Sequence, residues 1–269
     1  MKINKLLIVV VIVLFAGCKP VTETGAVAVT EPVIPAEPAC EMTLGMDAWE
    51  PYQYMTVGNS PTGLDVELVK AVAEIMSCRL DVVQGSWLEL LTLLKDGEVD
   101  FVLGASQTDE RKEFAYFSEP YRQERFQLYV RKDDTELPSA DLKAFLSAGH
   151  KVGIVNEYYY GDEVASLYAD EALRSKFVGA IISELNMARL LDEEIDGLLE
   201  DSFVGAAILR RKGLDKYIQP HSISLGSSDV FVMFSKASVQ EEQVQQFNQA
   251  LQQLRDNGAY NRLLEKYSH

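Results

Sequence analysis

The chain has 269 residues, of which 47% are hydrophobic and 25% are charged. Such a composition is ordinary for a globular protein, and this length suits one large domain or two of modest size. Acidic residues number 41 against 25 lysines and arginines, so the formal net charge is −16. A surface this negative repels phosphate groups, which argues against nucleic acid as a partner and against adsorption to anionic lipid.

The N-terminus has the pattern of a bacterial export signal. Two lysines precede an apolar run over residues 6–15, and Ala16-Gly17-Cys18 follows. The run is well short of the roughly 20 residues that a membrane-spanning helix needs, so residues 1–17 predict a signal peptide. The Ala-Gly-Cys ending resembles the lipobox of bacterial lipoproteins, in which cleavage precedes a cysteine that is then lipidated, although Phe15 replaces the usual aliphatic residue. A plain secretory signal with a chance cysteine is the alternative.

Residues 18–39 predict a flexible tether. The segment has neither helical nor strand periodicity, and prolines interrupt it at positions 20, 32, 35 and 38. It would hold a globular body away from the membrane to which Cys18 is anchored.

Two further cysteines, Cys40 and Cys78, flank one predicted strand–helix unit. In an oxidising compartment they would form a disulfide, and two separate buried thiols are the alternative. The cysteines and histidines lack the spacing of metal ligands, so we expect neither a metal site nor a cofactor.

The first half of the body alternates strands with helices. Strands are predicted at 42–46, 80–83 and 100–103, and helices at 65–76 and from the capping-box spacing Ser86-Trp87-Leu88-Glu89 onward. This β-α-β-α-β order predicts a lobe with a parallel, doubly wound sheet.

The second half repeats the theme. Extended segments are predicted at 126–130, 152–155, 177–182, 197–199 and 230–234, and helices at 141–148 and 183–191. Ser238 and Glu241 have capping-box spacing before an amphipathic helix that Asn257-Gly258 ends, and a last helix carries Tyr260 to Tyr267.

Several motifs in this order resemble the family-3 extracellular solute-binding proteins, the polar amino-acid receptors of ABC importers. The resemblance runs from about Leu44 to Tyr267. Its motifs are Gly63-Leu64-Asp65-Val66-Glu67-Leu68, Trp87-Leu88-Glu89-Leu90-Leu91, Asp96-Gly97-Glu98-Val99-Asp100, Thr108-Asp109-Glu110-Arg111, Phe117-Ser118-Glu119-Pro120-Tyr121, Asp141-Leu142-Lys143, Lys151-Val152-Gly153-Ile154 and Ile195-Asp196-Gly197.

The resemblance implies an α/β fold of the periplasmic-binding-protein type II. Two doubly wound lobes would be joined by crossovers near Val130 and Val230 and would close around a ligand. Lobe 1 would comprise residues 40–129 and 230–269, and lobe 2 residues 130–229. Independently, polar clusters follow several predicted strands, and ligands of open α/β sheets bind beyond the carboxyl ends of strands.

Two charged residues stand out as candidates for the ligand's charged ends. Arg111 resembles the family arginine that holds the ligand carboxylate, which a guanidinium can meet with two parallel hydrogen bonds. Alternatively, Arg111 is an ordinary solvent-exposed residue in a run of charged side chains. Asp201 matches the family aspartate that holds the ligand ammonium, and its alternative is an ordinary helix N-cap.

The remaining candidates lie in loops after predicted strands. The ligand-contacting positions of the family match Asp47, Trp49, Tyr52, Gly104 and Ser106. Tyr158 and Tyr159 replace the family's Gly-Ser/Thr-Thr turn, so the pocket is narrower there or meets the ligand through phenol hydroxyls. Turn or core roles are the alternatives for these residues.

We therefore predict a monomeric periplasmic lipoprotein that captures an amino acid or related small carboxylate for an ABC permease. Its contact with the membrane would be through lipid alone, and it would catalyse nothing. Ligand would shift the lobes from open to closed.

One alternative is a dehydratase acting on prephenate or arogenate, which needs a cleft acid of raised pKa such as Glu157, Glu184 or Asp229. Another is a ligand-sensing lipoprotein without a transport role.

Overall fold

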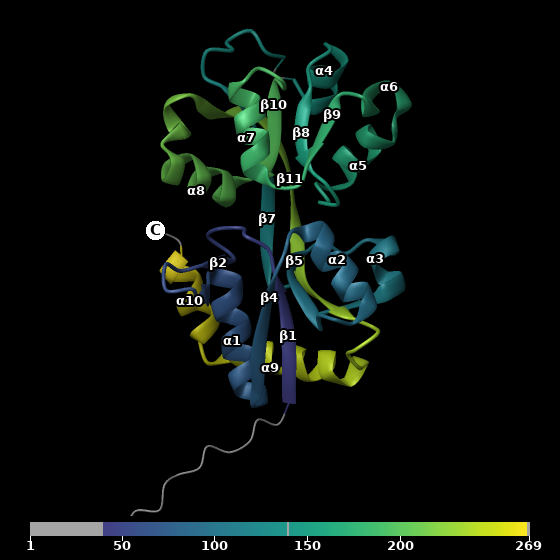
Figure 1. Ribbon diagram of the computed structural model, residues 1–269, viewed down its shortest axis with the longest axis vertical. Coiled ribbons are helices and arrows are strands. Elements are labelled where there is room, and N and C mark those ends of the chain that lie inside the picture. Colours follow the sequence, from purple (N-terminus) through teal and green to yellow (C-terminus); the bar gives the residue numbers. More distant parts are fainter. Residues whose placement is uncertain (1–39, 139, 268–269) are drawn as a thin grey trace, which may run out of the picture. The chain divides into compact units, whose positions relative to one another are not determined.

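The computed structural model describes residues 40–138 and 140–267 (Figure 1). The predicted signal peptide over residues 1–17, the lipidation site Cys18 and the tether up to residue 39 lie outside the described residues. Within the described part of the chain, no helix is long and apolar enough to cross a membrane.

One large sheet runs through the described body. Its strand order is β4-β1-β5-β11-β7-β10-β8-β9, and β6 also pairs with β11. At one end, β1 is parallel to both β4 and β5; at the other end, β8 is parallel to both β9 and β10. Two parallel segments, each with its own helices, give the predicted α/β fold with two doubly wound lobes.

Lobe 1 surrounds the β4-β1-β5 end of the sheet. Its strands are β1 (Cys40–Met46), β2 (Tyr54–Met55), β3 (Pro61–Thr62), β4 (Cys78–Gln84), β5 (Phe101–Ala105) and β6 (Ala115–Phe117), and its helices are α1 (Leu64–Met76), α2 (Trp87–Asp96), α3 (Asp109–Phe114), α9 (Glu241–Asp256) and α10 (Ala259–Tyr267). A disulfide joins Cys40 and Cys78, which face each other where β1 and β4 begin.

Lobe 2 surrounds the β10-β8-β9 end. Its strands are β8 (Val152–Val155), β9 (Phe177–Ala180) and β10 (Gly197–Asp201), and its helices are α4 (Leu142–Ser147), α5 (Asp162–Ala169), α6 (Glu171–Arg174), α7 (Ser183–Leu191), α8 (Ser202–Lys212) and the 3-10 turn η1 (Leu214–Lys216). Asp201, the last residue of β10, caps α8, so the end of β10 and the start of α8 are fixed to each other. Gly213 ends α8 in a left-handed conformation.

Two long antiparallel strands connect the lobes. They are β7 (Arg122–Arg131) and β11 (Ile218–Ser235), which pair with each other from Arg122↔Val230 to Arg131↔Ile218. The sequence predicted only the last part of β11, because Pro220, Gly226 and the serines around them obscure the strand pattern. The lobe limits at 129/130 and 229/230 stay predictions.

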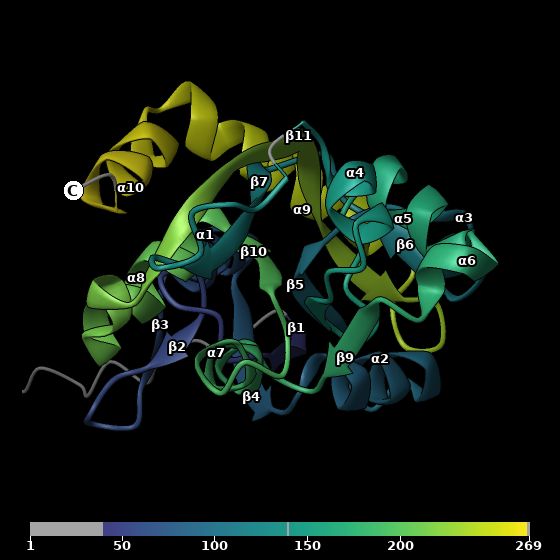
Figure 2. The same cartoon turned by 90° about the horizontal axis from the view of Figure 1, so that it is seen from above.

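The sheet of lobe 1 is buried on both faces, as a parallel sheet requires. Phe101 and Leu103 of β5 pack in a cluster with residues of α1 and α9, while Val102 between them points the other way into a cluster with α2. Figure 2 shows β1 and β5 lying between α9 and α2. The alternation along β5 explains why its sequence reads as a continuous apolar run.

Most predicted elements lie within a few residues of their expected positions, with one cap wrong. The predicted capping box at Ser86 and Glu89 is confirmed. The one at Ser238 and Glu241 is wrong: α9 begins at Glu241, and its capping box consists of Gln240 and Gln243. Glutamine at an N-cap is unusual, which is why the serine was the more attractive candidate.

Candidate functional site

The candidate site is a cavity between the lobes, where several strands end. Asp47 and Trp49 follow β1, Ser106 follows β5, and Tyr158 and Tyr159 follow β8. The other lining residues are Gln53, Trp87, Leu103, Gly104, Arg111, Glu124 and Phe126. The cavity therefore lies beyond the carboxyl ends of parallel strands, where ligands of this fold class bind.

Arg111 is buried at the edge of this cavity. Thr108 caps α3 by accepting the Arg111 backbone N–H at 3.2 Å, and this cap fixes where the side chain starts. The guanidinium donates to the carbonyl oxygen of Ser106 at 2.9 Å and to that of Glu157 at 2.6 Å. It also lies over the Trp87 ring, 5.3 Å from the ring centre. Among the described residues Arg111 forms no ion pair, so its charge faces the cavity without a carboxylate partner.

Glu124 brings a second buried charge to the same cavity. Its side chain projects from β7 and is only 4% exposed. Oε1 accepts the Ser106 hydroxyl at 3.1 Å, whereas Oε2 accepts no hydrogen bond from any residue that the structure describes. Burial raises the pKa of Glu124 to about 7, an effect that the positive charge of Arg122 opposes.

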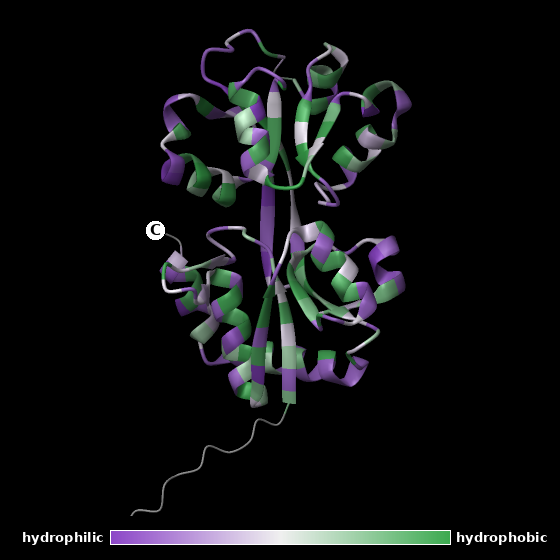
Figure 3. Ribbon diagram, viewed as in Figure 1, coloured by the Kyte–Doolittle hydropathy of each residue, from purple (hydrophilic) through white to green (hydrophobic). Residues whose placement is uncertain are grey.

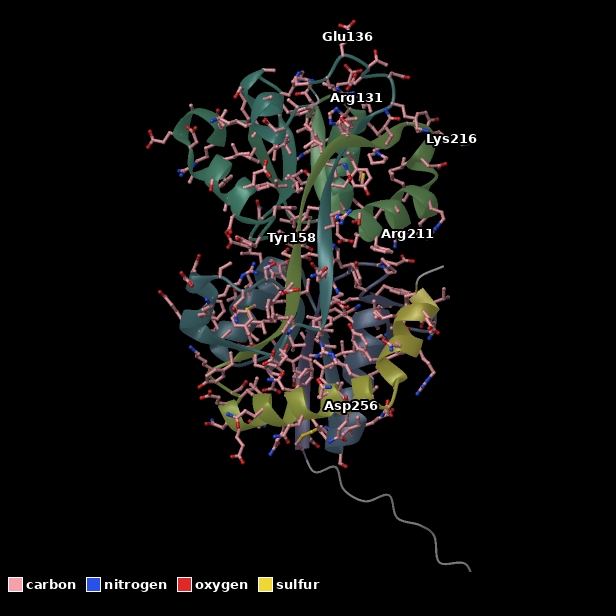
Figure 4. The ribbon with its side chains drawn as sticks, turned by 180° about the vertical axis from the view of Figure 1, so that it is seen from behind. Arg131, Glu136, Tyr158, Arg211, Lys216 and Asp256 are labelled. Carbon is pink, nitrogen blue, oxygen red and sulfur yellow. A yellow bond between two sulfur atoms is a disulfide. The ribbon has the colours of Figure 1, made fainter. Side chains whose placement is uncertain are left out.

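A segment of lobe 2 fills most of the space between these charges. Glu157 has φ of 64°, in the left-handed region, and its carbonyl accepts Arg111 and the Trp87 indole N–H, the latter at 3.1 Å. The Tyr158 hydroxyl donates to Asp47 at 2.8 Å, and its ring meets Trp49 and Trp87 edge to face. Figure 4 shows Tyr158 where the side chains of the two lobes meet.

The remaining cavity measures about 20 Å³. That is room for about one water molecule and much less than an amino acid fills. The backbone carbonyl of Glu157 thus bonds to the guanidinium of Arg111, and the phenol of Tyr158 bonds to the carboxylate of Asp47. Arg111 and Asp47 are the groups that would otherwise hold a ligand. A ligand can enter only when the lobes or this segment move.

Trp49 forms the wall opposite Tyr158. Its indole N–H donates to Oε1 of Glu200 at 3.2 Å across the lobes, and its ring packs on Gly104. Gly104 has φ of 73°, and a Cβ there would lie 3.1 Å from the Trp49 ring. The positive φ favours glycine, and a Cβ would in addition push against the Trp49 ring, so this candidate acts by letting the ring approach the backbone.

Two predicted site residues do not line the cavity. Asp201 is fully buried, and its carboxylate accepts the backbone N–H groups of Phe203, Val204 and Arg125. Its alternative role as an N-cap is what the structure shows. Tyr52 turns away because its ring stacks on the Arg122 guanidinium, 3.7 Å from the ring centre, and it lines a separate cavity of about 440 Å³ next to α10.

A buried ion pair supports the site from behind. Arg122 donates to both carboxylate oxygens of Asp65, at 2.9 and 3.0 Å. The Tyr121 hydroxyl donates to the same carboxylate at 2.6 Å and accepts the Gly104 N–H at 3.0 Å. In the sequence, Asp65 stands out only as part of the motif Gly63-Leu64-Asp65-Val66-Glu67-Leu68. In the structure it holds together the start of α1, the start of β7 and the cavity wall.

Glu124 and Trp87 were not among the predicted site residues. A signal for Glu124 exists, because alternate residues of β7 are buried and Arg122 and Glu124 share that inward face with Phe126. Figure 3 shows the middle of β7, between the two lobes, as hydrophilic. The three acids considered for catalysis are placed elsewhere: the Glu157 side chain is exposed, Glu184 pairs with Arg211, and Asp229 lines the separate cavity.

The two buried glutamates make the stability of the ligand-free protein depend on pH. Burial raises the pKa of Glu124 and of Glu200 from 4.5 to about 7. The folded protein therefore retains protons that the unfolded chain releases between these values. The retained protons stabilise the folded protein. This stabilisation is complete below pH 4.5 and is lost as the pH rises through 7, and it amounts to something on the order of 3 kcal/mol of unfolding free energy for each carboxyl.

We expect the free energy of unfolding to fall between pH 5 and pH 8. Urea titrations at both values measure it, and Glu124→Gln and Glu200→Gln should each flatten the dependence. Stability that rises over this interval would show that these carboxyls are ionised in the folded protein at pH 5.

The fold and the site together define a two-lobed ligand-binding protein, with strands from both lobes ending at one polar cavity. The chain belongs to the bacterial extracellular solute-binding proteins, family 3, whose sequence pattern matches residues 42–269.

Curated relatives and solved structures agree with this membership. The chain is 27% identical over 230 residues to the "Probable histidine-binding protein" of Neisseria gonorrhoeae, covering 81% of this chain and 78% of that protein. It is 26% identical over 229 residues to the arginine-binding extracellular protein ArtP of Bacillus subtilis (strain 168), covering 84% and 86%. The structure of an ancestral arginine-binding protein bound to arginine shares the fold, with a TM-score of 0.74 at 21% identity over 85% of this chain and 98% of that one.

Proposed function

We propose that this protein binds a free amino acid in the cavity between its lobes and does not turn it over. The observation that carries the proposal is Arg111, a buried guanidinium that main-chain carbonyls orient and that forms no ion pair with a described carboxylate. A ligand carboxylate would supply the missing charge through two parallel hydrogen bonds. The relatives named for histidine and arginine binding support an amino-acid ligand.

The other lining groups fit the rest of such a ligand. The rings of Trp49, Trp87 and Tyr158 enclose its apolar atoms, and Asp47 offers a carboxylate once Tyr158 moves. Burial raises the pKa of Asp47, while the hydrogen bond from Tyr158 opposes that effect. A cationic group of the ligand in place of the phenol would favour the ionised carboxylate still more.

Calorimetry against each of the twenty standard amino acids tests the proposal. We expect at least one to bind with micromolar or tighter affinity, about −8 kcal/mol. Sugars, divalent cations and spermidine serve as ligands without a carboxylate, and we expect none of them to bind. Binding confined to those compounds would contradict the proposal.

We further propose that the protein works outside the cytoplasm. There it would be a lipid-anchored monomer that delivers its ligand to an ABC permease. Membership of an extracellular solute-binding family supports the location. A role as a ligand sensor has the same site and differs only in the partner. Loss of uptake of the bound amino acid in a deletion strain distinguishes transport from sensing.

A dehydratase is the second candidate, because one observation favours it. Glu124 is a cleft carboxyl with a pKa near 7, the property required of a general acid. Incubation with prephenate and arogenate, followed by ultraviolet absorbance and product chromatography, tests this directly. We expect no turnover; turnover that Glu124→Gln abolishes would replace the binding proposal with an enzymatic one.

A further inference from the structure

We propose that Glu124 receives the α-ammonium of the bound amino acid, the role that family resemblance gives to Asp201. This inference rests on the proposed amino-acid binding and adds a residue that decides which ligands are accepted. The carboxylate of Asp201 is held by backbone donors, whereas one oxygen of Glu124 has no donor among the described residues.

Asp201 already accepts three backbone hydrogen bonds. Oδ1 accepts Phe203 N–H at 2.9 Å and Val204 N–H at 3.1 Å, and Oδ2 accepts Arg125 N–H at 3.3 Å. The residue is fully buried and does not border the cavity. The carboxylate is therefore held by the backbone of α8 and β7 rather than presented to the cavity.

Glu124 has the complementary properties. It borders the cavity, and its Oε2 atom is buried without a described hydrogen-bond donor. A buried carboxylate oxygen without a partner is unfavourable, and a ligand ammonium in the cavity would remove that penalty.

Ser106 sets the spacing between the two charged groups. Its carbonyl oxygen accepts Arg111 at 2.9 Å, and its hydroxyl donates to Glu124 at 3.1 Å. A guanidinium and a carboxylate held by one residue match a carboxylate and an ammonium attached to one carbon atom. The α-amino-acid group would then be recognised by lobe 1 and β7 alone, and lobe 2 would cover the side chain.

The charges around Glu124 leave room for one more cation. Arg122, its neighbour on β7, is already paired with Asp65 of α1, and Asp201 of β10 adds a further negative charge. Arg111 of α3 faces it across the cavity and is the group that would hold the ligand carboxylate. A ligand ammonium at Glu124 would give this carboxylate a cationic partner, while Arg111 pairs with the ligand carboxylate.

This arrangement predicts that binding depends on pH. Burial raises the pKa of Glu124 to about 7, so the carboxyl is partly protonated near neutrality, and an ammonium ligand requires it ionised. Ligand binding should therefore release a proton and weaken as the pH falls. From a pKa of about 7, the ionised fraction changes about tenfold between pH 8 and pH 6.

The experiment compares wild type, Glu124→Gln and Asp201→Asn by calorimetry at pH 8 and pH 6. The probes are whichever standard amino acid binds wild type most tightly and its analogue with hydrogen in place of the α-amino group. Circular dichroism establishes that each variant is folded. Buffers of different ionisation enthalpy report the number of protons released.

We expect wild type to prefer the amino acid over its deaminated analogue by at least about 100-fold and to bind it about tenfold more tightly at pH 8 than at pH 6. Glu124→Gln should weaken amino-acid binding at least about 30-fold, change binding of the analogue little, and abolish both the pH dependence and proton release. Asp201→Asn should keep the cap, because asparagine caps a helix about as well as aspartate, but lose the acceptor of the Arg125 N–H and so lower the melting temperature. It should retain both the preference and the pH dependence.

The outcomes separate the two proposals. A wild type that binds no amino acid overturns the proposed function itself. An amino-acid-binding wild type whose Glu124→Gln variant keeps the preference for the α-amino group overturns only the role of Glu124. Loss of that preference in a folded Asp201→Asn variant would return the role to Asp201.

Discussion

Arg111→Ala is expected to weaken amino-acid binding by about 2–4 kcal/mol, or roughly 30- to 1,000-fold. The reason is that an enclosed ligand carboxylate would lose its counter-charge and both parallel hydrogen bonds. Arg111→Lys should restore only part of the affinity, because an ammonium supplies the charge without the planar fork. Calorimetry with the amino acid that binds wild type most tightly measures both variants.

The ligand-free Arg111→Ala protein should lose much less, about 1 kcal/mol of unfolding free energy. The guanidinium bonds only main-chain carbonyls at the cavity edge, which water can reach once the side chain is gone. Arg125→Ala, on the exposed face of β7, serves as the matched control and should retain wild-type affinity. If the Arg111→Ala protein unfolds without ligand, the arginine is structural and the proposed carboxylate site is wrong.

The elements of the fold were predictable because burial on both sheet faces makes strands such as β5 and β8 continuous apolar runs. Helices such as α7 begin and end at the predicted residues, since their apolar positions recur at helical spacing. Prediction was incomplete in β11, whose pairing with β7 imposes an extended conformation on a segment rich in turn-forming residues. Tertiary pairing of that kind leaves little local signal.

The candidate site was predictable only in part, for a physical reason. Loop residues such as Asp47 and Arg111 follow strands, and the ends of parallel strands converge, so their proximity follows from the topology. The direction in which a side chain points does not follow from the topology. Asp201 and Glu124 are both acids at inward positions of neighbouring strands, and backbone N–H groups alone decide which of them stays free for a ligand.

Tyr158 illustrates the same limit. The sequence indicated a narrower pocket or a contact through a phenol, and the position of the ring depends on the left-handed conformation of Glu157. A glutamate gives no advance notice of such a conformation, which asparagine or glycine would have suggested.

Asp65→Ala is the substitution with the largest expected effect on stability, about 3–5 kcal/mol of unfolding free energy. The substitution leaves the buried Arg122 guanidinium without a counter-charge and removes the acceptor of the Tyr121 hydroxyl. Asp81→Ala is the matched control, because its ion pair with Arg79 is solvent-exposed and should contribute at most about 1 kcal/mol.

The same substitution should also affect the binding site, since Arg122 supports the rings of Trp49 and Tyr52, which follow β1. Its guanidinium lies 3.7 Å from the Tyr52 ring centre and 5.3 Å from that of Trp49. Without Asp65 the guanidinium is no longer held behind these two rings, so we expect the rings to lose their fixed positions and amino-acid binding to weaken. Urea titration measures the stability loss and calorimetry the loss of affinity. An Asp65→Ala protein within about 1 kcal/mol of wild type would mean that Arg122 finds solvent or another partner, and that the aromatic wall does not depend on this ion pair.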